Sequence, residues 1–201
     1  MHQLILNNFA MHIALAPAEQ EQALAFFQLM EVKKRTWLLH AGEVDRYIYF
    51  VNRGCLRMFY TDQSGEDHII GFYPENWWTC DIVSFFTVKP AANAIQALED
   101  SEVYCISLPQ LEKLFETIPK FERFFRILNQ NGFELYERRI TSQLYKTAEE
   151  RYIEFRKRHP GLEQRIAQKH IASYLGITPA FLSMMRKKRG SRKRSTSWPQ
   201  K

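Results

Sequence analysis

The sequence lacks any run of about 18 or more apolar residues, so no segment predicts a transmembrane helix and we expect no membrane partner. Residues 1–20 lack the basic start and the long apolar block of a secretory signal. Cysteine is scarce, because only Cys55, Cys80 and Cys105 occur, far apart and without a CxxC pair. Such a set argues against a disulfide framework and against a zinc site. These absences predict a cytoplasmic protein.

The motifs of several enzyme classes are also missing. The sequence contains no Walker A loop, no GxGxxG and no GxSxG. His12, His40 and His68 stand singly, without an HxH or HExxH pattern, which disfavours a metalloenzyme and a haem sensor. An iron–sulfur sensor would need clustered cysteines, and the three separate cysteines of this sequence therefore disfavour one. We therefore expect a protein that is not an enzyme and has no metal or cofactor, while an unknown small-molecule effector stays open.

The charge is divided unevenly along the 201 residues. Residues 1–150 hold 14 Lys and Arg against 20 Asp and Glu, whereas residues 151–201 hold 14 against 2. A basic segment neutralises phosphates and gains from counterion release, so nucleic acid is the first candidate partner. The alternative is a solvated basic tail that aids solubility.

Short β-branched and aromatic runs fill most of the first 108 residues. A helix is expected over 18–30, and turn residues then separate runs at 32–39, 47–52, 54–61, 68–73, 94–98 and 102–108. Many short strands at this spacing predict an antiparallel sandwich or barrel rather than βαβ units.

The period then changes to that of helices. Pro109 and Pro119 suit the first turns of a short and of a long helix, and a further helix is expected over 147–158. In the long helix an apolar face is formed by Phe121, Phe125, Leu128 and Leu135. Packing on the chain's own β domain would explain this face, but its length favours a second copy of the chain as partner.

Residues 168–187 have the spacing of a helix-turn-helix. Ala172 is small enough for two helices to cross, and Gly176 suits the turn four residues later. Thr178 provides an N-cap hydroxyl, and Pro179 suits the first turn of the next helix. An ordinary helical hairpin meets some of these demands, yet the full match beside a basic tail predicts DNA binding.

The second helix of this motif would enter the major groove, where its outward residues Pro179, Ala180, Ser183 and Met184 face base edges. These residues are poor in hydrogen-bond donors. We therefore expect strong electrostatic binding with modest direct readout, with thymine methyl contacts or DNA shape adding specificity. The candidate DNA-binding residues are Lys169, His170, Thr178, Pro179, Ala180, Ser183, Met184, Arg186, Lys187 and Lys188.

This order of a short helix, a β-rich domain, a long helix and a helix-turn-helix resembles the Crp/Fnr family of bacterial transcription regulators. The resemblance rests on residues 42–60, 75–107 and 171–183. It implies an α+β fold with a cyclic-nucleotide-binding-like jelly roll, or double-stranded β-helix, over 1–118, a dimerisation helix over 119–146 and a winged helix-turn-helix over 147–201. Only residues 190–201 remain for the wing, which is short for a β-hairpin, so a truncated or disordered wing stays open. The implied partners are double-stranded DNA, a second copy and RNA polymerase.

The effector pocket that the resemblance implies departs from the cyclic-nucleotide binders. Their Gly-Glu pair falls on Cys80-Asp81, and the Arg-Ser pair that grips the cyclic phosphate falls on Ala91-Ala92. A buried phosphate without that arginine loses a charge-assisted partner, so we expect no binding of cyclic AMP. Trp77 and Trp78 are candidates for lining an apolar cavity, or for simple core packing.

The recognition helix departs as well. Family members often carry an acidic residue at the position of Ala180 and an arginine at that of Met184. We expect a dimeric, sequence-specific DNA-binding transcription regulator with an effector-sensing roll that does not bind cyclic AMP. The alternative is a small-molecule-binding or vestigial sensor that acts by protein contacts without specific DNA binding.

Overall fold

The computed structural model describes residues 2–195, with side chains described to residue 188. The chain forms two compact units, Met1–Arg138 and Arg139–Lys201, whose boundary falls inside helix α5 (Lys120–Tyr145). The first unit also holds α1 (Gln3–Ala10), α2 (Pro17–Leu24), β1 (Gln28–Val32), β2 (Trp37–Leu39), β3 (Tyr47–Arg53), β4 (Leu56–Thr61), β5 (Asp67–Tyr73), β6 (Trp78–Thr79), α3 (Ile82–Thr87), β7 (Ala94–Ala97), β8 (Ser101–Ser107) and α4 (Leu108–Thr117). The second holds α6 (Ala148–Arg158), α7 (Leu162–Arg165), α8 (Gln168–Leu175) and α9 (Pro179–Ser195). The three-part division expected from the sequence stays a prediction.

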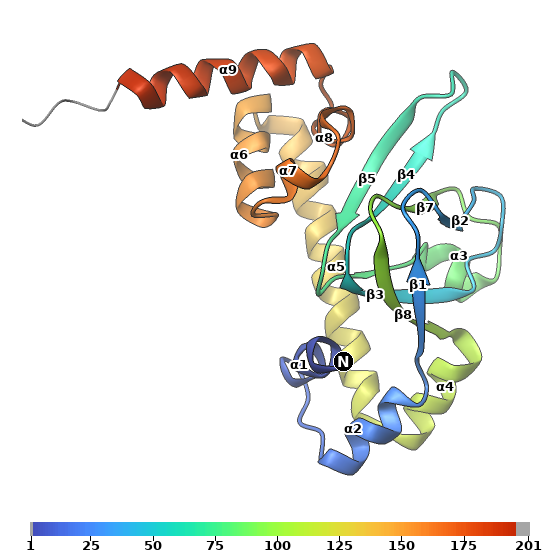
Figure 1. Cartoon of the computed structure of the whole chain (residues 1–201). Helices are drawn as coiled ribbons and strands as arrows, with labels where there is room; N and C mark the ends of the chain where they lie inside the picture. The colour runs from blue at the N-terminus through green and yellow to red at the C-terminus, as the bar shows by residue number, and fades with distance from the viewer. Residues whose placement is uncertain (1, 196–201) are drawn as a thin grey trace, which may run out of the picture. The chain divides into compact units, whose positions relative to one another are not determined.

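Two four-stranded antiparallel sheets make the body of the first unit, with strand orders β1-β8-β3-β6 and β2-β7-β4-β5 (Figure 1). Strand β8 lies between β1 and β3, so Cys105 stands opposite Gln28 on one side and Tyr49 on the other. Strand β4 lies in the same way between β5 and β7. The short apolar runs therefore pair as an antiparallel sandwich, and the predicted jelly roll with a long helix after it is confirmed.

The structure corrects the local assignment near the start of the chain. The helix expected over 18–30 ends at Leu24, and Gln28–Val32 form a strand instead. The reason is long-range pairing, since this strand joins β8 from Gln28 opposite Cys105 to Val32 opposite Ser101. Three helices, α1, α3 and α7, were not expected from the sequence.

An aromatic cluster joins α1 and the first half of α5 to the sheet. Phe9 packs edge-on against Phe121 with ring centroids 4.9 Å apart, and Trp78 lies 4.9 Å from Phe50. Phe125 belongs to the same cluster and is buried. Figure 1 shows α1, α2 and α4 around the first half of α5. Phe121 and Phe125, expected on a face toward a second copy, therefore lie in the core of their own unit.

The second unit is a small helical bundle. Helix α6 begins with a capping box, because Thr147 Oγ1 accepts a hydrogen bond from Glu150 N while Glu150 accepts one from Thr147 N. Its core consists of Tyr152, Phe155, Leu162, Ile166, Ile171, Ala172, Leu175, Leu182 and Met185. Helix α9 continues to Ser195, and the rest of the expected wing, residues 196–201, lies outside the described residues. Among the described helices, none is long and apolar enough to cross a membrane.

Candidate nucleic-acid interface and effector region

A tight turn joins α8 to α9. Gly176 ends α8 with φ +66°, a left-handed conformation that glycine adopts without strain. Ile177 N donates to Ala172 O at 3.0 Å, which closes the turn over the buried Ala172. Thr178 Oγ1 then accepts a hydrogen bond from Phe181 N at 3.2 Å, as an N-cap does. The glycine, the small residue and the cap thus lie where the sequence pattern requires them.

The inner faces of the two helices hold α9 against the bundle. Ile171 and Leu175 from α8 are buried, as are Leu182 and Met185 from α9. Residues with this spacing lie on one side of a helix, so the residues between them face outward. The packing fixes which face of α9 is available to a partner.

The outward face of α9 carries few hydrogen-bonding groups. Pro179 and Ala180 are exposed, Ser183 is half-buried, and Met184 is 56% exposed. Phe181 is 40% exposed and was missed by the sequence reasoning. Its spacing of three residues from Met184 was the signal that could have found it.

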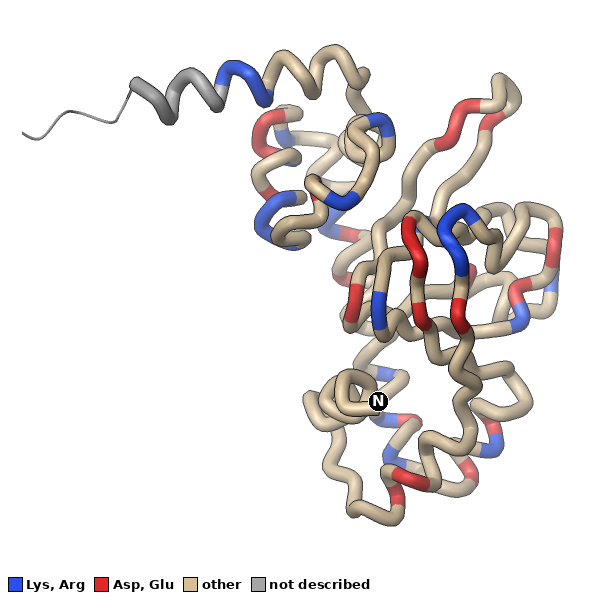
Figure 2. The backbone as a smooth tube through the Cα atoms, in the orientation of Figure 1, with Lys and Arg blue, Asp and Glu red and all other residues tan. Residues whose placement is uncertain are grey.

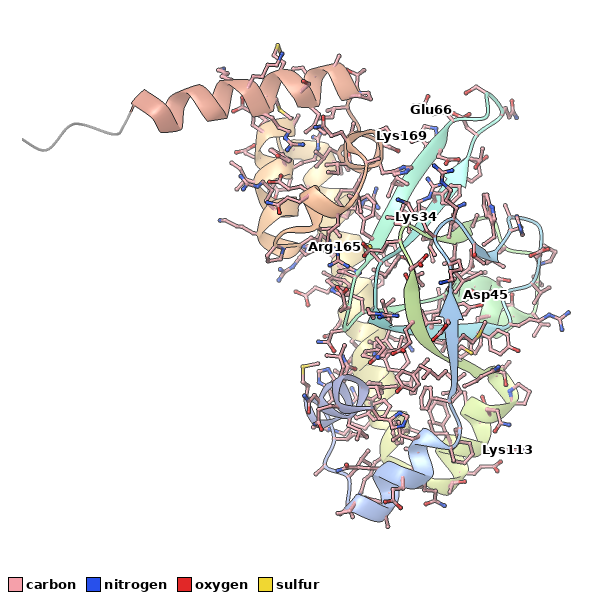
Figure 3. All side chains as sticks on the ribbon, in the orientation of Figure 1. Lys34, Asp45, Glu66, Lys113, Arg165 and Lys169 are labelled. Atoms are coloured by element: carbon pink, nitrogen blue, oxygen red, sulfur yellow. The ribbon has the colours of Figure 1, made fainter. Side chains whose placement is uncertain are left out.

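Basic side chains follow this face along α9 and also occur on α8. Lys187 and Lys188 are exposed and Arg186 is half-buried on α9, about two turns after Pro179. Lys169 is exposed in the first turn of α8, after Arg165 at the end of α7 (Figure 3). Figure 2 shows Lys and Arg on α6, α7, α8 and α9 of this unit. No Asp or Glu follows Glu163 in the sequence, so α8 and α9 carry no negative side chain to repel a polyanion.

Thr178 and His170 complete the set of expected contact residues. Thr178 is exposed, and its hydroxyl is occupied by the cap of α9. His170 is half-buried in the first turn of α8. The structure therefore brings all ten expected residues onto α8, α9 and the turn between them.

In the first unit, Asp81 lies at the position that the resemblance assigns to the ribose-binding glutamate. It is buried and caps α3, because its carboxylate accepts hydrogen bonds from Ser84 N at 3.0 Å and Asn93 Nδ2 at 2.9 Å. Both carboxylate oxygens already have partners from the protein. Asp81 acts here as a helix cap inside a closed polar cluster.

A second buried carboxylate stands next to it. Asp45, which Figure 3 labels, accepts a hydrogen bond from Asp81 N at 2.7 Å, and its own N–H donates to Ser84 Oγ at 2.9 Å. Burial raises the pKa of Asp45 to about 6, and the charge of Asp81 adds to that rise. This region therefore repels rather than attracts an anion when both carboxyl groups are ionised.

The other expected pocket residues bring no cation. Ala91 is buried, and its backbone bonds Glu43 O through N–H and Gly42 N through C=O. Ala92 is exposed. Burial raises the pKa of the Cys80 thiol well above its ordinary range, which keeps it protonated and unreactive.

The two tryptophans lie in different surroundings. Trp78 lies in the aromatic core and donates from Nε1 to Asn8 Oδ1 at 2.8 Å, while Trp77 is half-buried. The simpler interpretation, core packing, therefore describes Trp78. In the part of the chain that the structure describes, no three His, Cys, Asp or Glu side chains form a group that could hold a metal.

The second half of α5 exposes an apolar stripe. Phe133, Ile140 and Leu144 are 72%, 64% and 82% exposed, and Tyr136 is also exposed. Leu128 and Leu135, expected on the face toward a second copy, are half-buried, and Leu128 packs against the core of the first unit. Large apolar side chains at such spacing on one helix mark a surface that gains from a partner.

Comparison with known proteins supports the same fold. Residues 29–118 match the cyclic nucleotide-binding domain family. FixK2 from Bradyrhizobium japonicum is 18% identical, with a TM-score of 0.72 over 83% of this chain and 86% of that one. The c-di-GMP-responsive regulator CLP from Xanthomonas campestris is 16% identical, with a TM-score of 0.68 over 89% and 93%.

A regulator assigned to the Crp/Fnr family from Eubacterium rectale is also similar, at 16% identity and a TM-score of 0.66 over 89% of this chain and 85% of that one. No curated protein sequence matches the chain. These findings confirm the resemblance to the Crp/Fnr regulators in fold.

Proposed function

Because the chain has the fold of the Crp/Fnr regulators and a cyclic nucleotide-binding domain over residues 29–118, we propose that it is a dimeric, sequence-specific DNA-binding transcription regulator. Its β-roll, in this proposal, does not bind cyclic AMP. The protein acts in the cytoplasm on double-stranded DNA, with RNA polymerase as a further partner.

One observation carries the DNA-binding part of the proposal. Helices α8 and α9 are joined by a left-handed Gly176 and expose a face bordered by Lys169, Lys187 and Lys188, with no acid after Glu163. In helix-turn-helix proteins the second helix lies in the major groove, and Lys and Arg beside it neutralise phosphates. The N-terminus of α9 adds a partial positive charge at the same place.

The dimer is supported by the apolar stripe of α5. Four large apolar side chains are exposed together on this helix: Phe133, Tyr136, Ile140 and Leu144. A contiguous apolar patch of this kind is typical of a surface that binds another protein. A second copy, related by a twofold axis, would cover them and bring two recognition helices to successive major grooves about 34 Å apart. We assign the dimer face to these four residues, while Leu128 packs against the core of the first unit.

The closed polar cluster supports the loss of cyclic AMP binding. Asp81 is occupied by Ser84 and Asn93, and Asp45 adds a second buried carboxylate beside it. Neither Ala91 nor Ala92 offers a cationic side chain for a phosphate. A phosphate buried without a cationic partner costs several kcal/mol, or roughly three decades in affinity. Any effector of the roll is therefore a ligand without a buried phosphate at this place.

Selection from a randomised duplex pool tests the proposal, at about 150 mM salt, where non-specific electrostatic binding is weak. We expect an enriched, palindromic site whose half-sites are spaced by about one helical turn. A single unrepeated half-site would contradict the dimer, and binding without any enrichment would contradict sequence-specific regulation.

The second candidate function is a sensor that acts through protein contacts without specific DNA binding. The observation in its favour is the lack of strong hydrogen-bond donors among Pro179, Ala180 and Met184 on the outward face of α9. The same selection separates the two functions, because this sensor would enrich no sequence at all.

A further inference from the structure

Two large apolar side chains stand in water on α9. Phe181 is 40% and Met184 56% exposed, and residues three apart on a helix are neighbours on its surface. They do not serve the core of their unit, because Leu182 and Met185 already fill the inner face of the helix. Ala180 is exposed on the same first turn, so the patch has no polar side chain between its members.

The surroundings of this patch suit DNA better than another protein's apolar surface. Lys187 and Lys188 are exposed one turn later, three and four residues after Met184, and Lys169 is exposed at the start of α8. Like charges of this density, with no acid after Glu163, favour a polyanion. The cap from Thr178 Oγ1 to Phe181 N fixes the first turn of α9, so the patch is preformed.

We propose that Phe181 and Met184 are specificity-determining residues that contact the C5-methyl groups of thymine in the major groove. The inference rests on the proposed function, since it assumes that α9 enters the groove. Of the base pairs, only A·T presents a methyl group in the major groove. An apolar side chain that covers this methyl group removes the apolar surface of both from water. Neither side chain donates a strong hydrogen bond, so the methyl group is the feature of the base edge that they distinguish.

Replacing thymine by deoxyuridine tests the proposal, because it deletes the methyl group and leaves base pairing unchanged. The probe is the duplex that the randomised selection enriches, made once with thymine and then with uracil at each thymine position in turn. We expect about a fourfold loss of affinity of the wild-type protein for each methyl group that the patch covers. Positions outside the patch should show no loss.

Two variants assign the contact to these residues. Each of the variants Phe181→Ala and Met184→Ala should lose the sensitivity to uracil at one thymine position of the half-site. At the other positions the variant should still bind the thymine probe more tightly than the uracil probe, as wild-type protein does. Ile153→Ala is the matched control, since Ile153 is also an exposed apolar residue of the second unit but lies on α6. This control should keep the full sensitivity to the methyl groups. Thermal unfolding of each variant checks that the second unit stays folded.

The outcomes separate the inference from the proposed function. Wild-type protein that selects a site yet binds uracil and thymine probes equally overturns the inference alone. The same holds if folded Phe181→Ala and Met184→Ala both keep the wild-type sensitivity, as they would if the patch docks a protein instead. Absence of any enriched duplex overturns the proposed function, and with it the inference.

Discussion

The two units differ in the burial of the charged side chains at their candidate sites. In the first, Asp45 and Asp81 are buried and their hydrogen bonds end on the protein itself, on Ser84, Asn93 and backbone N–H groups. In the second, Lys169, Lys187 and Lys188 stand exposed around a preformed turn. A buried group whose bonds are complete has little left to offer a ligand, whereas an exposed charge gains when a phosphate displaces its counterions. This difference supports the proposed DNA interface on α8 and α9 rather than a ligand site around Asp81.

The largest loss of DNA binding is expected when the turn between α8 and α9 is destroyed. Gly176→Val places a β-branched residue at φ +66° and a Cβ 3.2 Å from Gln143 Oε1. We expect specific DNA binding to be lost in an electrophoretic or fluorescence titration. Gly132→Ala, which adds a Cβ in open space on α5, is the control and should bind normally. Full affinity of the Gly176 variant would refute the helix-turn-helix assignment.

Removing the charges is expected to have the next largest effect. The triple change of Arg186, Lys187 and Lys188 to Ala should weaken binding to every duplex by roughly a hundredfold, because phosphate contacts do not depend on sequence. The slope of log affinity against log salt should flatten by up to about 0.9 for each phosphate that the variant no longer neutralises. The sequence preference of the remaining binding should persist. An unchanged slope would mean that these residues do not face DNA.

A smaller effect, on the stability of the first unit, is expected from the buried Asp45. The pKa of Asp45 is raised from 3.8 to about 6 by burial, so the folded state holds this proton more tightly than the unfolded chain does. Its contribution to the free energy of unfolding is therefore greatest below about pH 4 and is lost as the pH rises to about 6, by up to about 3 kcal/mol.

Urea unfolding at several pH values measures this contribution. Asp45→Asn should remove the fall between pH 4 and 6 that wild-type protein shows. Asp100→Asn is the control and should keep this fall. Asp100 is an exposed carboxylate whose pKa is lowered by hydrogen bonds from Lys34 N and Lys33 Nζ. If Asp45→Asn leaves the pH profile as in wild type, the carboxyl is not buried as described.

No effect on thermal stability is expected from cyclic AMP. Addition of about 1 mM cyclic AMP should leave the Tm unchanged, because the closed cluster around Asp81 offers no partner for a phosphate. A ligand at a hundred times its Kd would add about 2.7 kcal/mol, which shifts the Tm of a domain this size by several degrees. A shift of that size would show that the polar cluster opens to bind a nucleotide.

The sequence predicted the parts of the fold that depend on local pattern. The strands β3, β4, β5, β7 and β8 and the turn at Gly176 lie where runs of apolar residues and turn residues placed them. Strand β1 was taken for the end of a helix, because its partner β8 lies some seventy residues away. Helix α3 was missed because it depends on the cap from Asp81, whose role appears only when Ser84 and Asn93 come together.

Part of the candidate site was predicted from local pattern, and part of it was missed because it depends on packing. Spacing identified Gly176 and Thr178, since a helix-turn-helix constrains them locally, and the uneven charge identified the basic residues. Periodicity could not separate a core face from a face toward a partner, so Phe121 and Phe125 were assigned to the dimer although they are buried. Phe181 was left out of the outward face, and only the inward packing of Leu182 shows that this aromatic residue faces out.

The salt dependence of wild-type binding is the direct test of whether α8 and α9 bind DNA. Affinity for the selected duplex and for a scrambled duplex of the same composition would be measured from about 50 to 200 mM salt. We expect a log–log slope of about −5 or steeper for both, with the selected duplex bound more tightly throughout. A slope near zero, with equal affinity for the two duplexes, would contradict the assignment of α8 and α9 to DNA.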